Sequence, residues 1–276
     1  MDVIAAVNGQ VTAEVSALYG LHFARVHGLR LVLLHVRNED DAIEAVEKSM
    51  AIIEEVAAGY DMATERVILE GSPVKTVRRY LVENKPEILF CSTRYRQHKR
   101  FFNLSFSEKL AGMMLPVDLA VVRVVHVHST LSTDRIVLPI KEDRLSAEKF
   151  TFFASMATAY KAGGEIYSVT VAGRRRRARL NLGDTKRILQ KIDDRLSHYL
   201  HLAELLNIPL RLKHAIALNE IDQVLHHLSH NDFHLMIIGG ERLSAYSALT
   251  RSRPIDRLQC FTPVNTIAFY PRGKKR

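Results

Sequence analysis

The chain has 276 residues, of which 47% are hydrophobic, 25% charged and 7% aromatic, and this composition excludes a disordered, collagen-like or coiled-coil chain. Its length predicts either one large domain or two smaller ones, each able to bury a hydrophobic core. The net charge of +9 predicts a basic surface that attracts phosphates, nucleic acid or anionic lipid, largely without specificity.

The first half of the chain alternates between short apolar runs, typical of buried strands, and longer stretches with apolar residues at helical spacing. We expect strands at Val3–Val7, Leu29–Val36, Arg66–Leu69 and Ile88–Phe90, and a last one between Pro116 and Val125. We expect helices at Thr12–His27, at Asp40–Ala58 and from Pro73 onward. Thr12 and Ser72 are the expected N-caps, and Gly28 is expected to end the first helix.

The same order begins again at Arg135, so the chain contains an internal repeat. We expect strands at residues 136–140, 165–171, 210–215 and 235–238, and a last one between Pro263 and Tyr270. Helices are expected at residues 146–162, 184–206 and 220–228. Strands that alternate with helices predict a parallel sheet with helices on both faces and right-handed crossovers.

The polar segment Val125–Thr133 marks the boundary between the two repeats. We therefore predict two tandem α/β domains, at residues 1–128 and 132–276, each with a doubly wound, parallel five-stranded sheet. Pairing of the closing strands Asp118–Val124 and Asn265–Tyr270 would join the domains as an intramolecular pseudo-dimer and remove two exposed sheet edges. A further homodimer stays open as an additional level of assembly.

Three features of the sequence bear on its location. The chain has no uncharged apolar run of about 18 residues, so we expect no transmembrane segment. The start MDVIAAVNGQ lacks a basic stretch before a long apolar core, so we expect no secretory signal. Cys91 and Cys260 are the only cysteines, too few for a disulfide framework or a thiolate zinc site. We therefore expect a cytoplasmic protein.

Several segments of the first half follow one another in a pattern seen in a known family: VIAAVNGQ with the helix after it, LVLLHV, LEGSPVKTVRRYLVENKPEILFCST, SFSEKL and LPVDLAVVRV. The second half repeats the pattern more loosely as IVLPIKED, EIYSVTV, HLMIIGGER, RPIDRL and TPVNTIAFY. In order and motifs the chain resembles the universal stress protein (UspA) family, whose fold is Rossmann-like. It resembles a tandem member, in which two domains on one chain replace a homodimer.

By this resemblance, one class of the family binds ATP through an acid after the first strand and a Gly-x2-Gly-x9-Gly-[ST] loop after the fourth. Glycines there let backbone N–H groups approach the phosphates, and the Ser or Thr lies at a helix N-terminus, where an anion is favoured. The loop positions correspond to Cys91, Arg94, Leu104 and Ser105 in the first half and to Gly239, Arg242, Ser252 and Arg253 in the second. The position of the acid after the first strand is occupied by Asn8 in the first half and by Lys141 in the second. The candidate cofactor-binding residues are therefore Asn8, Arg94, Ser105, Gly239 and Arg242, and the candidate cofactor is ATP or another adenine nucleotide.

The departures from the family pattern leave two interpretations open. Only Ser105 and Gly239 keep the family residue, so both loops are degenerate and nucleotide binding is lost. Alternatively, Arg94 and Arg242 bind an anion by their side chains, and Asn8 accepts a hydrogen bond from an adenine amino group.

Other candidate sites have a structural explanation. His226, His230 and His234 are four residues apart, but Asn231 and Asp232 are expected to end the helix between them, so we expect no metal site. Cys91 is expected to be a buried, inert thiol. The sequences GxxxxGK[ST], GxSxG and HExxH do not occur, and we assign no catalytic residue.

A run of arginines, Arg174, Arg175, Arg176 and Arg177 with Arg179, follows the second strand of the second half. We expect a solvated loop there, or a surface that binds an acidic partner, nucleic acid or a membrane. Our first hypothesis for the whole chain is a non-enzymatic universal stress protein that acts in stress response by binding a small ligand or a partner. The alternatives are an ATP-binding, weakly hydrolysing member of that family and a basic docking module for nucleic acid or a membrane surface.

Overall fold

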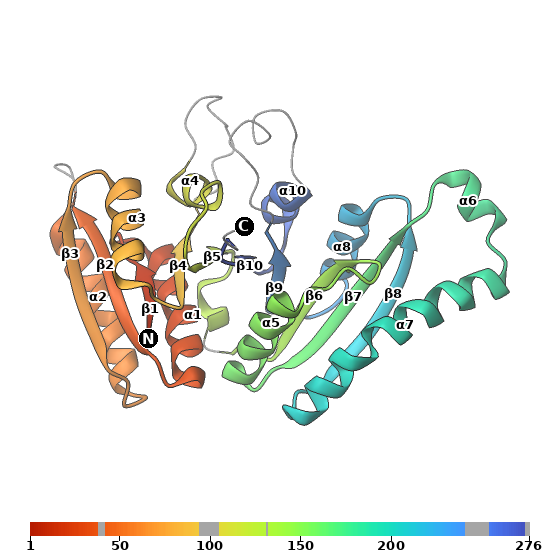
Figure 1. Cartoon of the computed structure of the whole chain (residues 1–276), viewed down its shortest axis with the longest axis horizontal. Coiled ribbons are helices and arrows are strands. Elements are labelled where there is room, and N and C mark those ends of the chain that lie inside the picture. The colour runs from red at the N-terminus through yellow and green to blue at the C-terminus, as the bar shows by residue number, and fades with distance from the viewer. Residues whose placement is uncertain (38–41, 94–104, 131, 241–253, 274–276) are drawn as a thin grey trace.

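The computed structural model describes residues 1–37, 42–93, 105–130, 132–240 and 254–273. Within them, ten strands form one sheet in the order β3-β2-β1-β4-β5-β10-β9-β6-β7-β8 (Figure 1). The second five strands therefore repeat the order of the first five, read from the opposite edge. None of the described helices is long and apolar enough to cross a lipid bilayer.

The first half supplies one side of the sheet, and its neighbouring strands are all parallel, as predicted. The central strands are buried on both faces: six successive residues of the second strand, from Leu31 to Val36, are buried. Such a strand needs a helix layer on each side. Its strands are β1 (Asp2–Ala6), β2 (Arg30–Arg37), β3 (Thr64–Glu70), β4 (Ile88–Ser92) and β5 (Asp118–Arg123). Its helices are α1 (Val11–His27), α2 (Ile43–Ala58), α3 (Pro73–Asn84) and α4 (Phe106–Ala111).

A short 3-10 helix, η1 (Val127–Thr130), leads into the second half, whose strands are likewise parallel to one another. Its strands are β6 (Arg135–Lys141), β7 (Gly163–Val171), β8 (Leu210–Ala217), β9 (Leu235–Gly239) and β10 (Asn265–Tyr270). Its helices are α5 (Ala147–Tyr160), α6 (Arg174–Arg179), α7 (Leu182–Leu205), α8 (Glu220–Ser229) and α10 (Pro254–Phe261).

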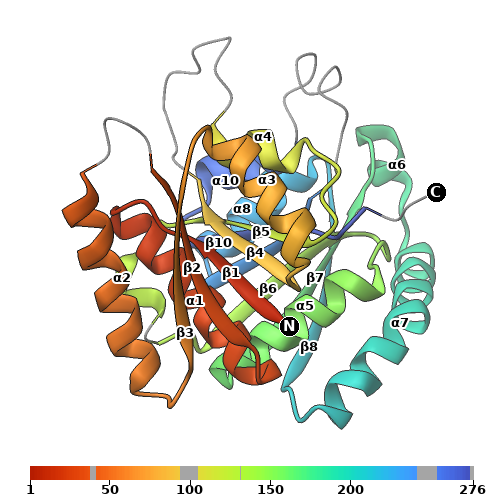
Figure 2. The same ribbon diagram turned by 60° about the vertical axis from the view of Figure 1, so that its left-hand side comes forward.

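Two apolar layers hold the helices to the sheet. The layer on one face includes residues of α1, α2, α5 and α7, and the layer on the other face includes residues of α3, α4, α8 and α10 (Figures 1 and 2). Each layer runs through both halves, so the halves share their core on both faces of the sheet.

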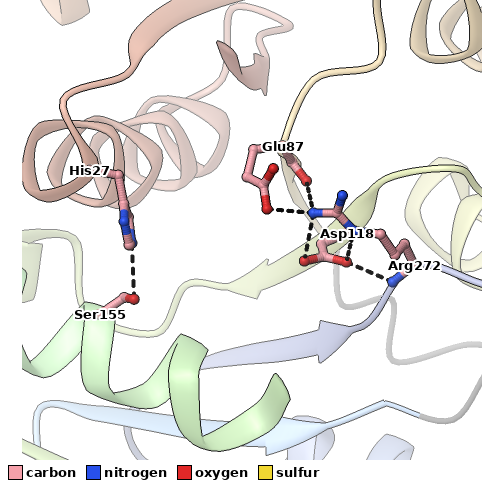
Figure 3. Close-up of polar contacts among 5 residues, drawn as sticks. All are labelled: His27, Glu87, Asp118, Ser155 and Arg272. Atoms are coloured by element: carbon pink, nitrogen blue, oxygen red, sulfur yellow. Dashed lines mark hydrogen bonds and ion pairs between the residues drawn. The ribbon is translucent and has the colours of Figure 1, made fainter. Parts of the chain in front are cut away.

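The junction between the halves is the antiparallel pair β5–β10, in which Val121 lies opposite Ala268. This pairing joins the two halves in one sheet and confirms the predicted intramolecular pseudo-dimer. Polar contacts lie on both sides of it: His27 of α1 is hydrogen-bonded to Ser155 of α5 at 2.9 Å, and Arg272 binds Asp118 and Glu87 (Figure 3).

Two details of the helix ends differ from the prediction. Thr12 is not an N-cap, because α1 begins at Val11, with Gln10 as the capping residue and no side-chain cap bond. Ser72 does occupy the N-cap position of α3, but its side chain makes no cap bond either. Gly28 ends α1 as predicted, with a positive φ of 62° that glycine adopts without strain.

Candidate functional site

The topology places one ligand crevice in each half. In a doubly wound sheet, a crevice opens at the carboxyl ends of the two strands between which the chain order reverses. These strands are β1 and β4 in the first half and β6 and β9 in the second. Three of the predicted site residues, Asn8, Ser105 and Gly239, lie in the described part of the chain, whereas Arg94 and Arg242 lie outside it.

Asn8 lies two residues beyond β1 and is exposed. Its Oδ1 accepts the backbone N–H of Gln10 at 3.2 Å, which shapes the turn into α1. The turn is tight: Gly9 has a φ of +74°, and a Cβ at this residue would lie 3.0 Å from the backbone of Ala45 and Val46. The amide oxygen that would have to meet an adenine amino group is therefore engaged in local structure.

Ser105 is the N-cap of α4 and forms a complete capping box. Its hydroxyl accepts the backbone N–H of Glu108 at 3.3 Å, and its own backbone N–H is bound by the Glu108 carboxylate at 2.7 Å. A second hydroxyl, that of Ser107, lies 3.2 Å from the Ser105 hydroxyl. The protein's own carboxylate thus binds the N–H group that a phosphate would need at this helix start.

Cys91 lies within β4 and is 1% exposed. Burial raises the pKa of its thiol to about 12, so the group is a neutral, packed side chain rather than a nucleophile. This confirms the expectation of a buried thiol.

In the second half, Gly239 ends β9 and Gly240 follows. A Cβ added at Gly239 would overlap the end of the Lys149 side chain, and one added at Gly240 would overlap the ring of Tyr270. The space over each glycine is therefore filled by a side chain of this same half. Lys149 comes from the first turn of α5, which starts beside the same crevice.

Lys141, in the place of the family acid, ends β6 and is exposed. Its neighbourhood includes the carboxyl group of Glu220, at the start of α8. Burial raises the pKa of Glu220, and the charges of Lys141 and Arg144 act in the opposite direction. The reversed charge at Lys141 is thus opposed by an acid of the same half.

The histidines of α8 have structural partners. The rings of His226 and His230 stack with centroids 4.2 Å apart, and His227 binds the buried Glu165 at 2.5 Å. Lys213 also binds Glu165, at 3.0 Å. Burial acts to raise the pKa of Glu165, but the bonds from His227 and Lys213 outweigh it and lower the pKa overall. Across the described ranges, no three His, Cys, Asp or Glu side chains are grouped so that they could hold a metal ion.

The arginine run forms the short helix α6 rather than the expected loop. Arginine and alanine have high helix propensity, so an exposed stretch of this composition is compatible with a helix. The C-terminus of α6 turns at Leu180 into the long helix α7, whose N-cap Asn181 accepts the backbone N–H of Asp184 at 2.8 Å. A cavity of about 650 Å³ lies between the two helices.

Lys149 is the site residue that sequence reasoning missed. It lies 90 positions before Gly239, in a helix whose first turn gives no sign of a partner. A topological argument could have found it, because the helix after the first strand of a half starts beside the end of the fourth.

No protein-family model matches the sequence, and no curated protein matches it either. Solved structures do match in fold. A universal stress protein from Archaeoglobus fulgidus shares 13% identity, with a TM-score of 0.67 over 100% of this chain and 97% of that one. A protein of Pseudomonas aeruginosa UCBPP-PA14 that carries the same family name shares 11% identity, with a TM-score of 0.63 over 98% and 93% of the two chains.

The cytoplasmic domain of a prokaryotic cation chloride cotransporter is also similar, with 13% identity and a TM-score of 0.56 over 99% of this chain and 96% of that one. The chain therefore has the tandem universal stress protein fold along its whole length, as its sequence motifs predicted.

Proposed function

We propose that this chain is a non-enzymatic universal stress protein that acts by binding a small ligand or a partner. We also propose that neither of its two nucleotide loops binds ATP. One observation carries the proposal: the hydroxyl and backbone N–H of Ser105 are both engaged with Glu108. A phosphate arriving at this helix start would have to displace a carboxylate of the same chain.

The second half supports the same proposal. Lys149 fills the space over Gly239, where the family pattern needs bare backbone, and Tyr270 fills the space over the neighbouring Gly240. Partner binding also suits the fold, because a similar structure serves as the cytoplasmic domain of a cation chloride cotransporter.

A second candidate function, ATP binding with weak hydrolysis, is favoured by the position of Lys149. Its ammonium group lies against Gly239 at the crevice of the second half. A lysine there can bind a phosphate as a point charge, with Arg242 as a second cation from the loop.

Thermal unfolding with ATP, ADP, AMP and cyclic nucleotides separates the two candidates. A site with a Kd of about 10 μM would add about 2.7 kcal/mol at about 1 mM ATP, which raises the Tm by several degrees. We expect a shift below about 1 °C for every nucleotide. A saturable shift that Lys149→Met and Arg242→Ala abolish would establish the ATP-binding candidate instead. Ser105→Ala and Arg94→Ala test the first half in the same way. For each variant, the Tm with nucleotide is compared with the Tm of the same variant without nucleotide.

A further inference from the structure

Most of the chain's net positive charge comes from one segment. Residues 173–191, named here the basic arm, hold eight of the 39 Lys and Arg and one of the 30 Asp and Glu, which is +7 of the net +9. The rest of the chain is close to neutral. The basic character that the composition shows is therefore a property of one structural element and not of the surface as a whole.

Most of the basic arm lies at the margin of the protein, and Ile188 is the residue through which it packs against the core. Figures 1 and 2 both show α6 at the outer margin, beyond the strands of the sheet. Among the arm residues whose exposure the structure describes, none is buried. The buried residues of α7 all follow the arm: Ile192, Leu196, Tyr199 and Ala203. In the first half only five residues separate β2 from α2, whereas ten residues separate β7 from α7 in the second half.

The cavity between α6 and α7 has cations on both of its walls. Arg175 and Arg179 line it from α6, and Arg187 and Lys191 line it from α7. The acid among its lining residues, Asp184, is paired with Arg187 at 2.5 Å. Leu180 and Ile188 complete the lining. An anion in this groove would meet positive charge from two sides.

We propose that the basic arm binds nucleic acid through its phosphate backbone. A linear chain of phosphates can lie along a groove and touch both walls, and arginine binds phosphate oxygens with two parallel hydrogen bonds. The arm has no aromatic residue, so it offers no surface on which bases could stack. Binding is therefore electrostatic and independent of base sequence.

The shape of the arm fits nucleic acid better than a membrane. Arg174, Arg175 and Arg177 are exposed, and at about 100° per residue they point to different sides of α6. A flat bilayer would contact one side of such a helix and would also need an apolar face to insert. Of the large hydrophobic side chains in the arm, only Leu182, at 87%, is strongly exposed.

Fluorescence anisotropy with short labelled oligonucleotides, single-stranded and duplex, tests the proposal on the full chain over a series of salt concentrations. The test variant is R175Q/R179Q/K191Q, which leaves the Arg187–Asp184 pair intact. The matched control is K75Q/R78Q/R79Q, which removes two arginines and one lysine that are exposed on α3. Both triple variants replace exposed side chains, so we expect both to fold, with circular dichroism as the check.

We expect the arm variant to lower the salt slope of log K by about 3 and to weaken binding by about tenfold or more at low salt, because three phosphate contacts are lost. The α3 variant should bind like the unmodified chain. Equal losses in the two variants, or no loss in either, would contradict the proposal. So would binding to phosphatidylserine vesicles that depends on the arm when oligonucleotide binding does not. The arm lies apart from the strand-end crevices, so this proposal and the one on nucleotide loops can fail separately.

Discussion

Asp118 and Asn265, the first residues of β5 and β10, hold equivalent positions in the two halves and make the same contact in different surroundings. The Asp118 carboxylate accepts the backbone N–H of Arg272 at 2.6 Å, and Asn265 Oδ1 accepts that of Val125 at 2.7 Å. Each donor lies two residues beyond the end of the opposite strand. The repeat has thus kept a backbone contact at both ends of the junction.

The two ends differ in charge because they differ in access to water. Asn265 is completely buried, and its amide also donates to the Tyr19 hydroxyl at 3.0 Å and to the His126 carbonyl at 2.8 Å. The Asp118 side chain is 20% exposed and takes the Arg272 guanidinium as a partner. A neutral amide can be satisfied in a buried place, whereas a carboxylate needs a cation or water.

Exchanging the two residues should have very unequal effects. Asn265→Asp would put a carboxylate where the His126 carbonyl now receives a hydrogen bond, and we expect it to lower the free energy of unfolding by about 3 kcal/mol at pH 7. Asp118→Asn keeps an acceptor for the Arg272 N–H and loses a partly exposed ion pair, so we expect a loss of about 0.5–1 kcal/mol. Urea unfolding of both variants measures the difference.

The pH dependence of the Asn265→Asp variant provides a control. Burial favours the neutral acid, so part of the lost stability should return as the pH falls to about 5. Losses of equal size in the two variants would show that the two ends of the junction do not differ in the way described.

The two halves also contribute differently to the contact between α1 and α5. The first half places a buried histidine there, His22 of α1, whereas α5 contains no histidine. The His22 ring lies 4.5 Å from that of Tyr160 and 5.5 Å from that of Tyr60. Burial, and then the charge of Arg25, lower the pKa of His22 to about 4. The folded chain therefore binds fewer protons than the unfolded chain between about pH 6.5 and pH 4.

Stability should consequently fall as the pH drops through that window. We expect His22 to contribute a loss of about 2 kcal/mol between pH 7 and pH 5. His22→Phe keeps a ring against Tyr60 and Tyr160 but does not titrate, so urea unfolding of this variant should depend less on pH by that amount. His27, whose pKa burial also lowers, is present in both proteins. Identical pH profiles would rule out His22 as the titrating group.

The smallest expected difference concerns the N-caps of α3 and α8, the helices that precede the fourth strand of each half. Asn219 caps α8 by accepting the backbone N–H groups of Ile221 and Asp222, at 2.9 and 3.4 Å, whereas Ser72 makes no such bond to α3. We expect Asn219→Ala to cost about 1 kcal/mol and Ser72→Ala only a few tenths. Differential scanning calorimetry of the two variants should show a lower Tm for Asn219→Ala alone; equal shifts would contradict the difference in capping.

The succession of strands and helices along the chain could be predicted because each central strand is an apolar run of strand length between clear helix signals. Leu31–Val36 is such a run, and so is Leu235–Ile238. The predicted N-cap Thr12 lies two residues after the observed one, Gln10, because the Asn8 side chain and the positive φ of Gly9 shape the entry to the helix. The arginine run was predicted as a loop because polarity indicates exposure but does not distinguish an exposed helix from an exposed coil.

For the candidate site, the sequence predicted which chain positions lie in it but not the contacts that those residues make. The family pattern pointed to Ser105 and Gly239, but not to what surrounds them. The engagement of Ser105 by Glu108 follows from local spacing, since Ser-x-x-Glu is a capping-box pattern. The contact of Lys149 with Gly239 joins residues far apart in the chain, and no periodicity carries that information.

The sequence alone is enough to predict the repeated order of strands and helices and the concentration of arginines between the second predicted strand and the second predicted helix of the second half. These features depend on local hydrophobic spacing and composition, which each segment carries with it. Three features become visible only in the folded chain: Lys149 lies over Gly239, Asn265 is buried where Asp118 is not, and the arginines of α6 form one wall of a groove. Each of these depends on which distant segments meet and on how much water reaches them, and packing alone fixes both.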